Sequence, residues 1–534
     1  MKKKLLFFSF IVFQFFAFAQ EDAWVFLNAK ANVANALANP QTILTQDAID
    51  RKNNHGITID FRDVPVDESY ITQLKSATGI TVMAKSKWFN AVHVRGTETN
   101  INNLLIESFV DHIEFANRSL NARRSFVVNN KFEIEDAQIT FVYGNTQNQV
   151  EMINADGLHL LDYTGTGMVI AVLDAGFPNV NTMGSFQRLR DAGNLRDGYD
   201  FVNRDDDEFA YSGNNHGTKV LSDMAGFIEN AFVGTAPDAS YYLFRTEDAG
   251  SENPIEESYW VEAAERADSL GVDVINTSLG YKDFDNPNYD YTSADMNGLT
   301  AFITRGANIA FEKGLLLVNS AGNSGASGVN APADSANVLS IGAVDSNGNY
   351  ASFSSQGSAI QPTQKPDVVA RGSGSYVIDD SNNIVQNNGT SFSSPIMAGG
   401  VTCLWQALPN KTNAEIMQLV RESASQYATP DYFLGFGIPD LQQALNSALS
   451  IGLEEEIELS IYPNPIQHKL NIVFAESIEN ISLKLYNILG KQIINKTIYK
   501  NKPSINLESL SSGIYIVKLQ ADNKKSKTFK LIKE

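Results

Sequence analysis

The chain has 534 residues, and domains typically hold about 100 to 200 residues, so about three folding units are expected. Hydrophobic residues make up 43% and charged residues 19%, which supports a large core and excludes the composition of a disordered chain. The formal charge of -20 argues against a nucleic-acid partner, because such binders need clustered lysine and arginine. Solubility is the simpler reason for the acidic balance.

The N-terminus has the pattern of a cleavable export signal, predicted over residues 1–19. A basic stretch at Lys2 to Lys4 precedes an apolar run from Leu5 to Phe16, and Ala17-Phe18-Ala19 matches a small-x-small cleavage site. We therefore expect the exported chain to begin at Gln20. No later stretch reaches 18 apolar residues, so no other transmembrane segment is expected.

Residues 20–124 alternate short strand-like runs with amphipathic helical runs, which predicts a small α/β domain. A connector with weaker periodicity follows, from Arg123 to about Phe141. The predicted strands are Trp24 to Leu27, Ile80 to Ala84, Phe89 to Val94 and His112 to Phe115, and the predicted helices are Glu68 to Ala77 and Ile101 to Phe109.

Residues 125–450, with a core from about Tyr143, change to continuous apolar runs separated by segments of helix length. This pattern predicts an α/β domain whose parallel sheet is covered by helices on both faces. Functional sites in such sheets form at the carboxyl ends of the strands. The predicted strands are Met168 to Leu173, Tyr241 to Phe244, Val272 to Asn276, Leu315 to Val318 and Val338 to Val344.

Residues 451–534 begin with an acidic linker at Glu454 to Glu456 and then become rich in lysine, with no arginine. Short strand-like runs separated by turn residues predict a small all-β sandwich. The runs are Leu470 to Phe474, Ser482 to Tyr486, Ile493 to Ile498, Ile514 to Leu519 and Thr528 to Ile532.

Three polar residues of the central domain, Asp174, His216 and Ser391, are candidate catalytic residues. Asp174 directly follows the apolar strand that ends at Leu173, although a lone aspartate there is more often a turn residue. His216 lies ahead of a helical run, and only one other histidine, His159, belongs to this domain, so the choice of a neutral-pH base is narrow.

Ser391 precedes a strongly apolar segment, Ile396 to Leu408, which predicts a buried helix that tolerates Pro395 in its first turn. A serine at such a helix N-terminus has a fixed hydroxyl with backbone N–H groups nearby, as a nucleophile beside an oxyanion site requires. As an isolated Gly-Thr-Ser it would be an ordinary N-cap.

Six segments in order resemble the subtilisin-like serine peptidases, whose catalytic residues follow the chain order Asp, His, Ser. The segments are Ile170 to Gly176, His216 to Thr218, Gly234 to Pro237, Asn276 to Gly280, Ser320 to Gly325 and Gly389 to Pro395. The resemblance implies a secreted serine endopeptidase with Ser391 as nucleophile, His216 as general base and Asp174 orienting the base. Asn323 and the Ser391 N–H would stabilise the oxyanion.

The same resemblance assigns the substrate-binding backbone. Ser278, Leu279 and Gly280 would pair with an extended substrate, and Ser320, Ala321 and Gly322 would bound the primary specificity pocket together with the Asn330-Ala331-Pro332 turn. The longer loop from Lys282 to Met296 is expected to be solvated surface.

No cofactor is required for this chemistry, and structural calcium is left open. The acidic run from Asp205 to Glu208 matches no defensible calcium motif, so a solvated loop is preferred there. Cys403, the only cysteine, excludes an intrachain disulfide and is expected to be a small core residue.

The flanking blocks have resemblances of their own. Residues 20–124, notably Asn90 to Gly96, resemble the inhibitory propeptide of these enzymes, and a cut is expected between about Asn117 and Tyr143. The last block resembles the C-terminal sorting domain of the type IX secretion system at Tyr462 to Pro465, Leu485 to Lys491 and Gly513 to Tyr515. A carbohydrate-binding or adhesive module would fit its strands equally well.

These resemblances imply polypeptide substrates, the chain's own propeptide and the type IX machinery as partners, with a location outside the cell or on its outer surface. Two other functions stay open: an inactive binding protein on the same fold, and an esterase. Asp174, His216, Asn323 and Ser391 together speak against the first, and the extended binding edge speaks against the second.

Overall fold

The structure is a computed structural model that describes residues 20–121, 141–450, 459–474, 479–487, 492–521 and 526–533. It divides into two compact units, Met1–Asn446 and Ser447–Glu534. The export signal over residues 1–19, nearly all of the connector and the acidic run at 454–456 lie outside the described residues.

The N-terminal domain contains a four-stranded antiparallel sheet in the order β2-β3-β1-β4, and each of the four strands predicted for it overlaps one of these strands. Its strands are β1 (Gln20–Leu27), β2 (Ile80–Ser86), β3 (Ala91–Thr97) and β4 (Val110–Phe115). Helix α3 (Glu68–Ser76) matches its prediction. The helix expected over residues 101–109 is wrong in its bounds, because α4 (Glu98–Asn103) begins earlier, where the Thr97 hydroxyl accepts the Asn100 N–H, and a 3-10 turn follows it.

The segment between β1 and α3 contains structure that the sequence pattern did not predict. It forms α1 (Val33–Ala38), α2 (Gln46–Asn54) and two 3-10 turns at Pro40–Thr42 and Phe61–Asp63. Three of its buried apolar residues, Leu44, Ala48 and Ile49, form a small cluster separate from the core of the sheet. So few apolar positions give almost no helical periodicity to detect.

The central domain has a seven-stranded parallel sheet in the order β13-β12-β11-β10-β5-β9-β6, which confirms the predicted fold class. Two short strands, β6 and β13, had no sequence signal. The strands are β5 (Val169–Asp174), β6 (Tyr199–Asp200), β9 (Ser240–Arg245), β10 (Val274–Thr277), β11 (Leu316–Ser320), β12 (Leu339–Val344) and β13 (Val368–Arg371).

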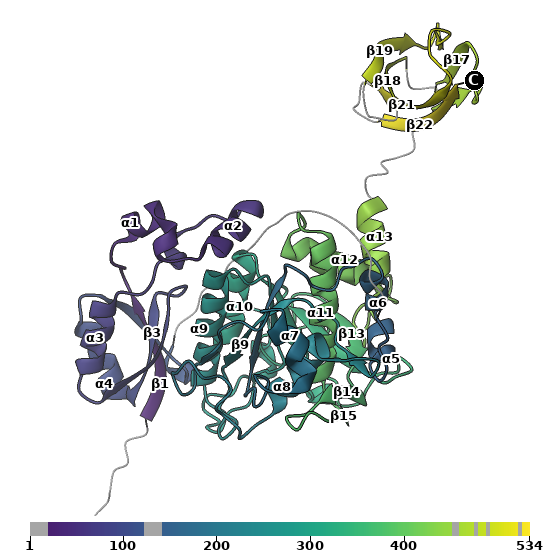
Figure 1. The fold of residues 1–534 in the computed structure, drawn as a ribbon. Coiled ribbons are helices and arrows are strands. Elements are labelled where there is room, and N and C mark those ends of the chain that lie inside the picture. Colours follow the sequence, from purple (N-terminus) through teal and green to yellow (C-terminus); the bar gives the residue numbers. More distant parts are fainter. Residues whose placement is uncertain are drawn as a thin grey trace, which may run out of the picture. The chain divides into compact units, whose positions relative to one another are not determined.

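Helices cover both faces of this sheet (Figure 1). Helices α9 (Ile255–Leu270) and α10 (Phe302–Glu312) pack against each other on one face, and α8 (His216–Ala225) packs against α11 (Thr390–Ala407) on the other. The smaller elements are α5 (Gln147–Glu151), α6 (Ala155–His159), α7 (Gln187–Asp191), β7 (Phe227–Ile228), β8 (Phe232–Val233), β14 (Ser375–Ile378), β15 (Ile384–Asn387), α12 (Asn413–Glu422) and α13 (Leu441–Ser450).

The C-terminal unit is all β, as predicted, with antiparallel sheets in the orders β16-β17-β20 and β19-β18-β21-β22. Alternate residues of β18, namely Ile481, Leu483 and Leu485, are buried in its core. The strands are β16 (Ser460–Tyr462), β17 (Lys469–Val473), β18 (Asn480–Asn487), β19 (Gln492–Tyr499), β20 (Ser504–Asn506), β21 (Gly513–Ala521) and β22 (Ser526–Lys533).

Within the described parts of the chain, no helix has both the length and the apolar character to cross a membrane.

Candidate active site

The register of the parallel sheet aligns three of the sequence-predicted site residues along its carboxyl edge. Thr277, the last residue of β10, is paired with β5 on one side and with β11 on the other. Asp174, Ser278 and Ser320 therefore occupy equivalent positions on three adjacent strands. This edge is where ligand-binding residues gather in parallel sheets.

Asp174 and His216 are in direct contact. The His216 Nδ1 atom lies 2.7 Å from Asp174 Oδ1, and the Asp174 side chain is completely buried. His216 was expected to lie ahead of a helix, whereas it is the first residue of α8, and its N–H donates to Asn214 Oδ1 at 2.8 Å. Burial disfavours the imidazolium, but the charge of Asp174 and its hydrogen bond outweigh burial and raise the pKa of His216 above 6.5.

Ser391 lies in the first turn of α11, which begins at Thr390 rather than after the serine. Pro395 is consequently inside the helix and has no N–H to donate to the carbonyl four residues earlier, which is that of Ser391. The Ser278 hydroxyl donates to this carbonyl at 2.8 Å instead. In return the Ser391 hydroxyl donates to the Ser278 carbonyl at 3.3 Å.

His216 lies near Ser391, although the two are not hydrogen-bonded. The His216 ring lies 5.8 Å, between centroids, from the ring of Phe392, the residue after Ser391. Ser391 and His216 both belong to the described residues, and no hydrogen bond joins them there. A catalytic contact that is absent before substrate binds is common among hydrolases.

Asn323 has its carboxamide oriented by Thr390. Its Oδ1 accepts the Thr390 N–H at 2.9 Å and the Thr390 hydroxyl at 3.0 Å, so its NH₂ group points away from this contact. Asn323 is exposed, and its Nδ2 would lie 3.7 Å from a Cβ added to Gly389. The Ser391 N–H is one of the first N–H groups of α11, which have no intrahelical partner. Two donors are thus available near the serine hydroxyl.

The predicted substrate-binding segments are side by side and braced by their carbonyls. Asn319 donates its amide to the Leu279 carbonyl at 3.0 Å, and Asn330 donates to the Gly280 carbonyl at 3.3 Å. An antiparallel bridge joins Tyr281 to Ala331, which brings the predicted pocket turn against the strand edge. The two segments are therefore held as one backbone surface.

A cavity of about 600 Å³ opens beside His216, Ser278 and Leu279. Its other wall, which the sequence analysis did not assign, is acidic and includes Glu247 and Glu252. Burial and neighbouring carboxylates raise the pKa of Glu252 to about 7 and also raise that of Glu247. Glu247 and Glu252 could have been predicted as site residues from the sequence, because they follow β9 at the carboxyl edge of the sheet.

The acidic run from Asp205 to Glu208, predicted to be solvated, is exposed at its three aspartates, and the prediction is wrong for Glu208. Asp205 and Asp207 each accept a nearby backbone N–H at the surface, whereas Glu208 is buried and accepts the Gly198 N–H at 3.1 Å. The carboxylates of this run therefore do not converge on one point.

Among the residues that the structure describes, one trio of carboxylates is close enough to share a cation. Glu247, Glu252 and Glu256 have ligand atoms within 4.8 Å of one another. Glu256 already accepts the N–H groups of Asp248 and Asn253, so its oxygens have partners without a metal.

The remaining candidates of the central domain belong to the core. His159 is buried with both ring nitrogens engaged, by the Tyr143 hydroxyl at 2.7 Å and the Thr235 carbonyl at 3.0 Å. Cys403 is a buried free thiol whose Sγ lies 3.2 Å from the same carbonyl, as expected of a small core residue. The solvated interpretation of Lys282 to Met296 is wrong for Tyr289 and Tyr291, which are buried.

Comparison with known proteins identifies the family of the chain that carries this site. A model of the subtilase family matches residues 165–437, just over half of the chain. The chain belongs to the subtilase family. As a subtilase it is a serine endopeptidase, and the matched region contains every catalytic and substrate-binding residue predicted above.

Curated relatives agree with this family. The chain is 28% identical over 311 residues to "Alkaline protease" of Alkalihalobacillus alcalophilus, an alignment that covers 58% of this chain and 72% of the relative. It is 30% identical over 315 residues to "Alkaline elastase YaB" of Bacillus sp. (strain YaB), with the same two shares. It is also 30% identical over 300 residues to "Subtilisin E" of Bacillus subtilis (strain 168), covering 55% of this chain and 70% of the relative.

The flanking domains of this subtilase match families as well. Residues 22–132 match the peptidase S8 propeptide domain of Bacteroidota, and residues 460–534 match the secretion system C-terminal sorting domain. Both resemblances are thereby confirmed, and the match favours sorting over an adhesive module. The protein is therefore secreted, either extracellular or attached to the outer cell surface.

Proposed function

We propose that this subtilase hydrolyses peptide bonds through Ser391, His216 and Asp174, with an acyl-enzyme intermediate. The observation that supports this most is the 2.7 Å hydrogen bond between His216 Nδ1 and the buried Asp174, beside the first turn of α11. A buried carboxylate that fixes one ring nitrogen leaves Nε2 as the nitrogen that accepts a proton.

Each proton transfer then has a named donor and acceptor. The Ser391 hydroxyl turns from the Ser278 carbonyl toward His216, and its oxygen bonds to the scissile carbonyl carbon while its proton passes to Nε2. His216 gives that proton to the leaving amine as the C–N bond breaks. A water molecule next transfers a proton to His216 and attacks the ester, and Ser391 recovers its proton as the acid product leaves.

The negative charge of the tetrahedral intermediate would be met by two donors. These are the NH₂ group of Asn323, whose Oδ1 is occupied by Thr390, and the backbone N–H of Ser391. Donors held before the reaction need no reorganisation when the charge develops, so they lower the barrier rather than tighten substrate binding.

Substrate recognition in this proposal uses the backbone. The segment of Ser278, Leu279 and Gly280 would pair with an extended peptide, and Ser320, Ala321 and Gly322 would bound the primary pocket. Because asparagine side chains already hold the carbonyls of Leu279 and Gly280, this edge is rigid before substrate arrives.

The proposed reaction needs no metal or organic cofactor, since the side chains and backbone named above supply every proton transfer and the charge stabilisation. Structural calcium stays a separate prediction, which melting curves with and without a chelator would check. The chain's own propeptide is the first expected substrate, because it is tethered ahead of the enzyme.

The experiment is fluorophosphonate labelling of the purified full-length protein, followed by peptide mapping and assays on matched peptide and ester substrates. We expect one labelled residue, Ser391, with loss of labelling in Ser391→Ala and unchanged labelling in Ser393→Ala. Labelling elsewhere, or none in a folded and processed protein, would refute the triad. Ester hydrolysis without peptide hydrolysis would make the enzyme an esterase.

A further inference from the structure

The helical segment between β1 and α3 makes contacts that the sheet of the propeptide does not. It lies against the C-terminal ends of α9 and α10 on the enzyme (Figure 1). The Thr45 N–H donates to the Ser269 carbonyl at 3.0 Å, and the Arg51 guanidinium donates to the Lys313 carbonyl at 2.9 Å. We name residues 39–63 of this segment the docking arm.

Two enzyme glycines let the arm approach closely. Gly271 follows α9 and Gly314 lies just after α10, both with a left-handed φ near +86° and +87°. A Cβ on Gly271 would lie 2.8 Å from the Ala48 nitrogen, and one on Gly314 would lie 2.1 Å from Ile57 Cδ1. A side chain at position 271 would press on the backbone of the docking arm, whereas one at position 314 would first displace the end of the Ile57 side chain.

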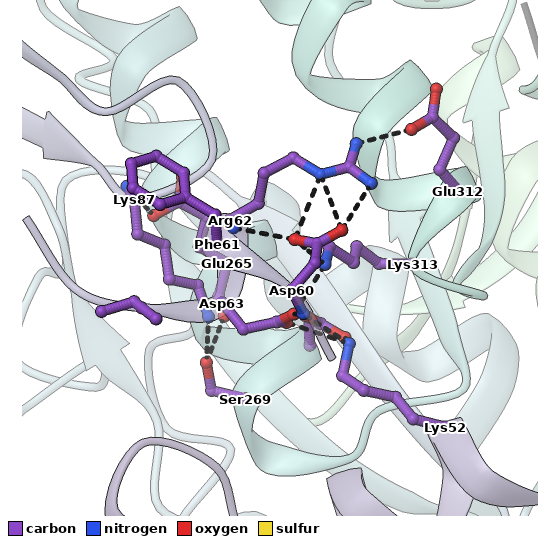
Figure 2. Close-up of polar contacts among 12 residues, drawn as sticks. Lys52, Asp60, Phe61, Arg62, Asp63, Lys87, Glu265, Ser269, Glu312 and Lys313 are labelled. Carbon is purple, nitrogen blue, oxygen red and sulfur yellow. Dashed lines mark hydrogen bonds and ion pairs between the residues drawn. The ribbon is translucent and has the colours of Figure 1, made fainter. Parts of the chain in front are cut away.

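Five charged side chains of this contact are almost completely excluded from water: Arg51, Lys52 and Asp63 from the arm, and Asp268 and Lys313 from the enzyme. Arg51, which pairs with Asp268, is 4% exposed. Lys52 and Asp63 are 0% exposed, as is Asp268, and Lys313 is 1% exposed. Lys52 Nζ lies 2.7 Å from Asp268 and 3.3 Å from Asp63, and Lys313 Nζ lies 2.7 Å from Asp63. Figure 2 shows Lys52, Asp63 and Lys313 meeting at the centre of the contact.

The arm brings cations to two helix C-termini of the enzyme. Asp268 belongs to the last turn of α9 and Lys313 caps α10, where helix dipoles favour cations, and the arm supplies Arg51 and Lys52 there. Burial alone would raise the pKa of Asp268, but the charges of Lys52 and Arg51 outweigh it and lower that pKa. Outside the buried centre, Arg62 reaches Glu312 of the enzyme at 2.6 Å.

A buried charge that loses its partner is costly, whereas the same charge exposed to water is not. Lys52 and Asp63 leave their enzyme partners only when the whole arm departs, since they sit at the centre of the contact. We propose that the docking arm is a charge-matched latch that sets how long the propeptide stays on the enzyme after the connecting segment has been cut.

This proposal goes beyond catalysis, and its test is independent of the triad. The full-length Ser391→Ala chain, with a recognition sequence for a sequence-specific protease inserted in the connector between residues 122 and 140, is cut by that protease. Release of the N-terminal fragment on dilution is then followed by size-exclusion chromatography. Failure of the triad would change labelling and turnover but not this release.

The decisive variant is Lys52→Met, which keeps the length of the side chain and removes the buried cation. Removing one partner of a buried charge pair mainly speeds dissociation. Because Asp268 keeps Arg51 and Asp63 keeps Lys313 in this variant, we expect release several-fold faster. The matched control is Lys75→Met, in the same domain, because Lys75 is exposed in the last turn of α3. Release unchanged in a folded Lys52→Met chain would overturn the latch.

The ion pair between Arg62 and Glu312 provides an independent test in case Lys52→Met does not fold. Arg62 and Glu312 are 33% and 30% exposed, so changing the charge of Glu312 leaves no charge buried. Glu312→Arg is expected to speed release several-fold, because it sets two guanidinium groups against each other, and Glu312→Gln is expected to speed it less. Equal release from Glu312→Arg and the unsubstituted chain would likewise contradict the proposal, and melting curves of the uncut chains verify folding.

Discussion

Replacing Thr390 by valine tests whether Asn323 is held for catalysis. Thr390 is completely buried, so valine fills the same volume and removes only the hydroxyl. The hydroxyl donates to Asn323 Oδ1 at 3.0 Å and accepts the Gly322 N–H at 3.3 Å, whereas the backbone bond from Thr390 N–H remains. The variant therefore loosens the amide of Asn323 without deleting it.

The size of the effect follows from those two bonds. Each is worth about 0.5 to 1.5 kcal/mol, so their loss costs about 1 to 3 kcal/mol. If this loss falls on the transition state, kcat decreases by about 5-fold to 150-fold, while KM changes little because the oxyanion forms only after binding.

The assay is steady-state hydrolysis of a chromogenic peptide, with the melting temperature measured in parallel. Thr402→Val is the matched control, since Thr402 is buried in the same helix and its hydroxyl donates only to the Ala398 carbonyl. It should lose similar stability and keep its kcat. A Thr390→Val enzyme with normal kcat, or with kcat lowered no more than in the control, would refute the orienting role of Thr390.

Four further predictions follow from the proposed site and tail. Ser391→Ala should abolish peptide hydrolysis and leave the propeptide covalently attached, and a trimmed Ser391→Ala chain from a protease-deficient host would exclude self-processing. Asn323→Ala should lower kcat about 100-fold to 1000-fold, the range known for such donors in subtilisin, with KM nearly unchanged. Since Asp174 raises the pKa of His216 and only neutral His216 accepts a proton, kcat/KM should fall as the pH drops through that pKa. Asp174→Asn should move this midpoint to lower pH, and an unmoved midpoint would assign the titration to another group. A chain ending near Ser450 should cleave peptides when made in a foreign host and accumulate in the periplasm of its native cell, and normal appearance outside that cell would refute the sorting role.

Long apolar runs made the main sheet predictable. Each of the five strands predicted for the central domain overlaps an observed strand, because a buried parallel strand needs consecutive apolar residues. The same run placed Asp174 at its end. Short elements had no such signal: β6 has two residues and β13 has four, and their pairing depends on neighbours distant in the sequence.

Local sequence also failed to predict the start of α11, because a hydrogen bond from a distant residue replaces one inside the helix. Pro395 indicated a helix beginning after Ser391, whereas α11 begins at Thr390. The helix continues through Pro395 because Ser278, more than a hundred residues earlier, donates to the carbonyl that proline leaves free. That partner is known only once β10 and α11 are placed together.

One face of α9 is polar, and the reason involves the enzyme both with its propeptide bound and after the propeptide has left. Ser258, Glu262, Glu265 and Asp268 recur at helical spacing, which would ordinarily indicate a face in contact with solvent. In this chain that face is covered. Ser258 contacts Trp24 and His93, and the carboxylate of Glu265 accepts the Ser86 hydroxyl and the N–H groups of Lys87 and Trp88.

An apolar stripe on α9 would bind the propeptide more simply, but it would remain exposed on the mature enzyme once the propeptide has left. A stripe of hydroxyl and carboxylate groups is satisfied by propeptide donors before activation and by water afterwards, so it costs little in either state. Temporary interfaces are generally more polar than permanent ones for this reason. The charged contact between Lys52 and Asp268 is the continuation of this stripe at the end of the helix.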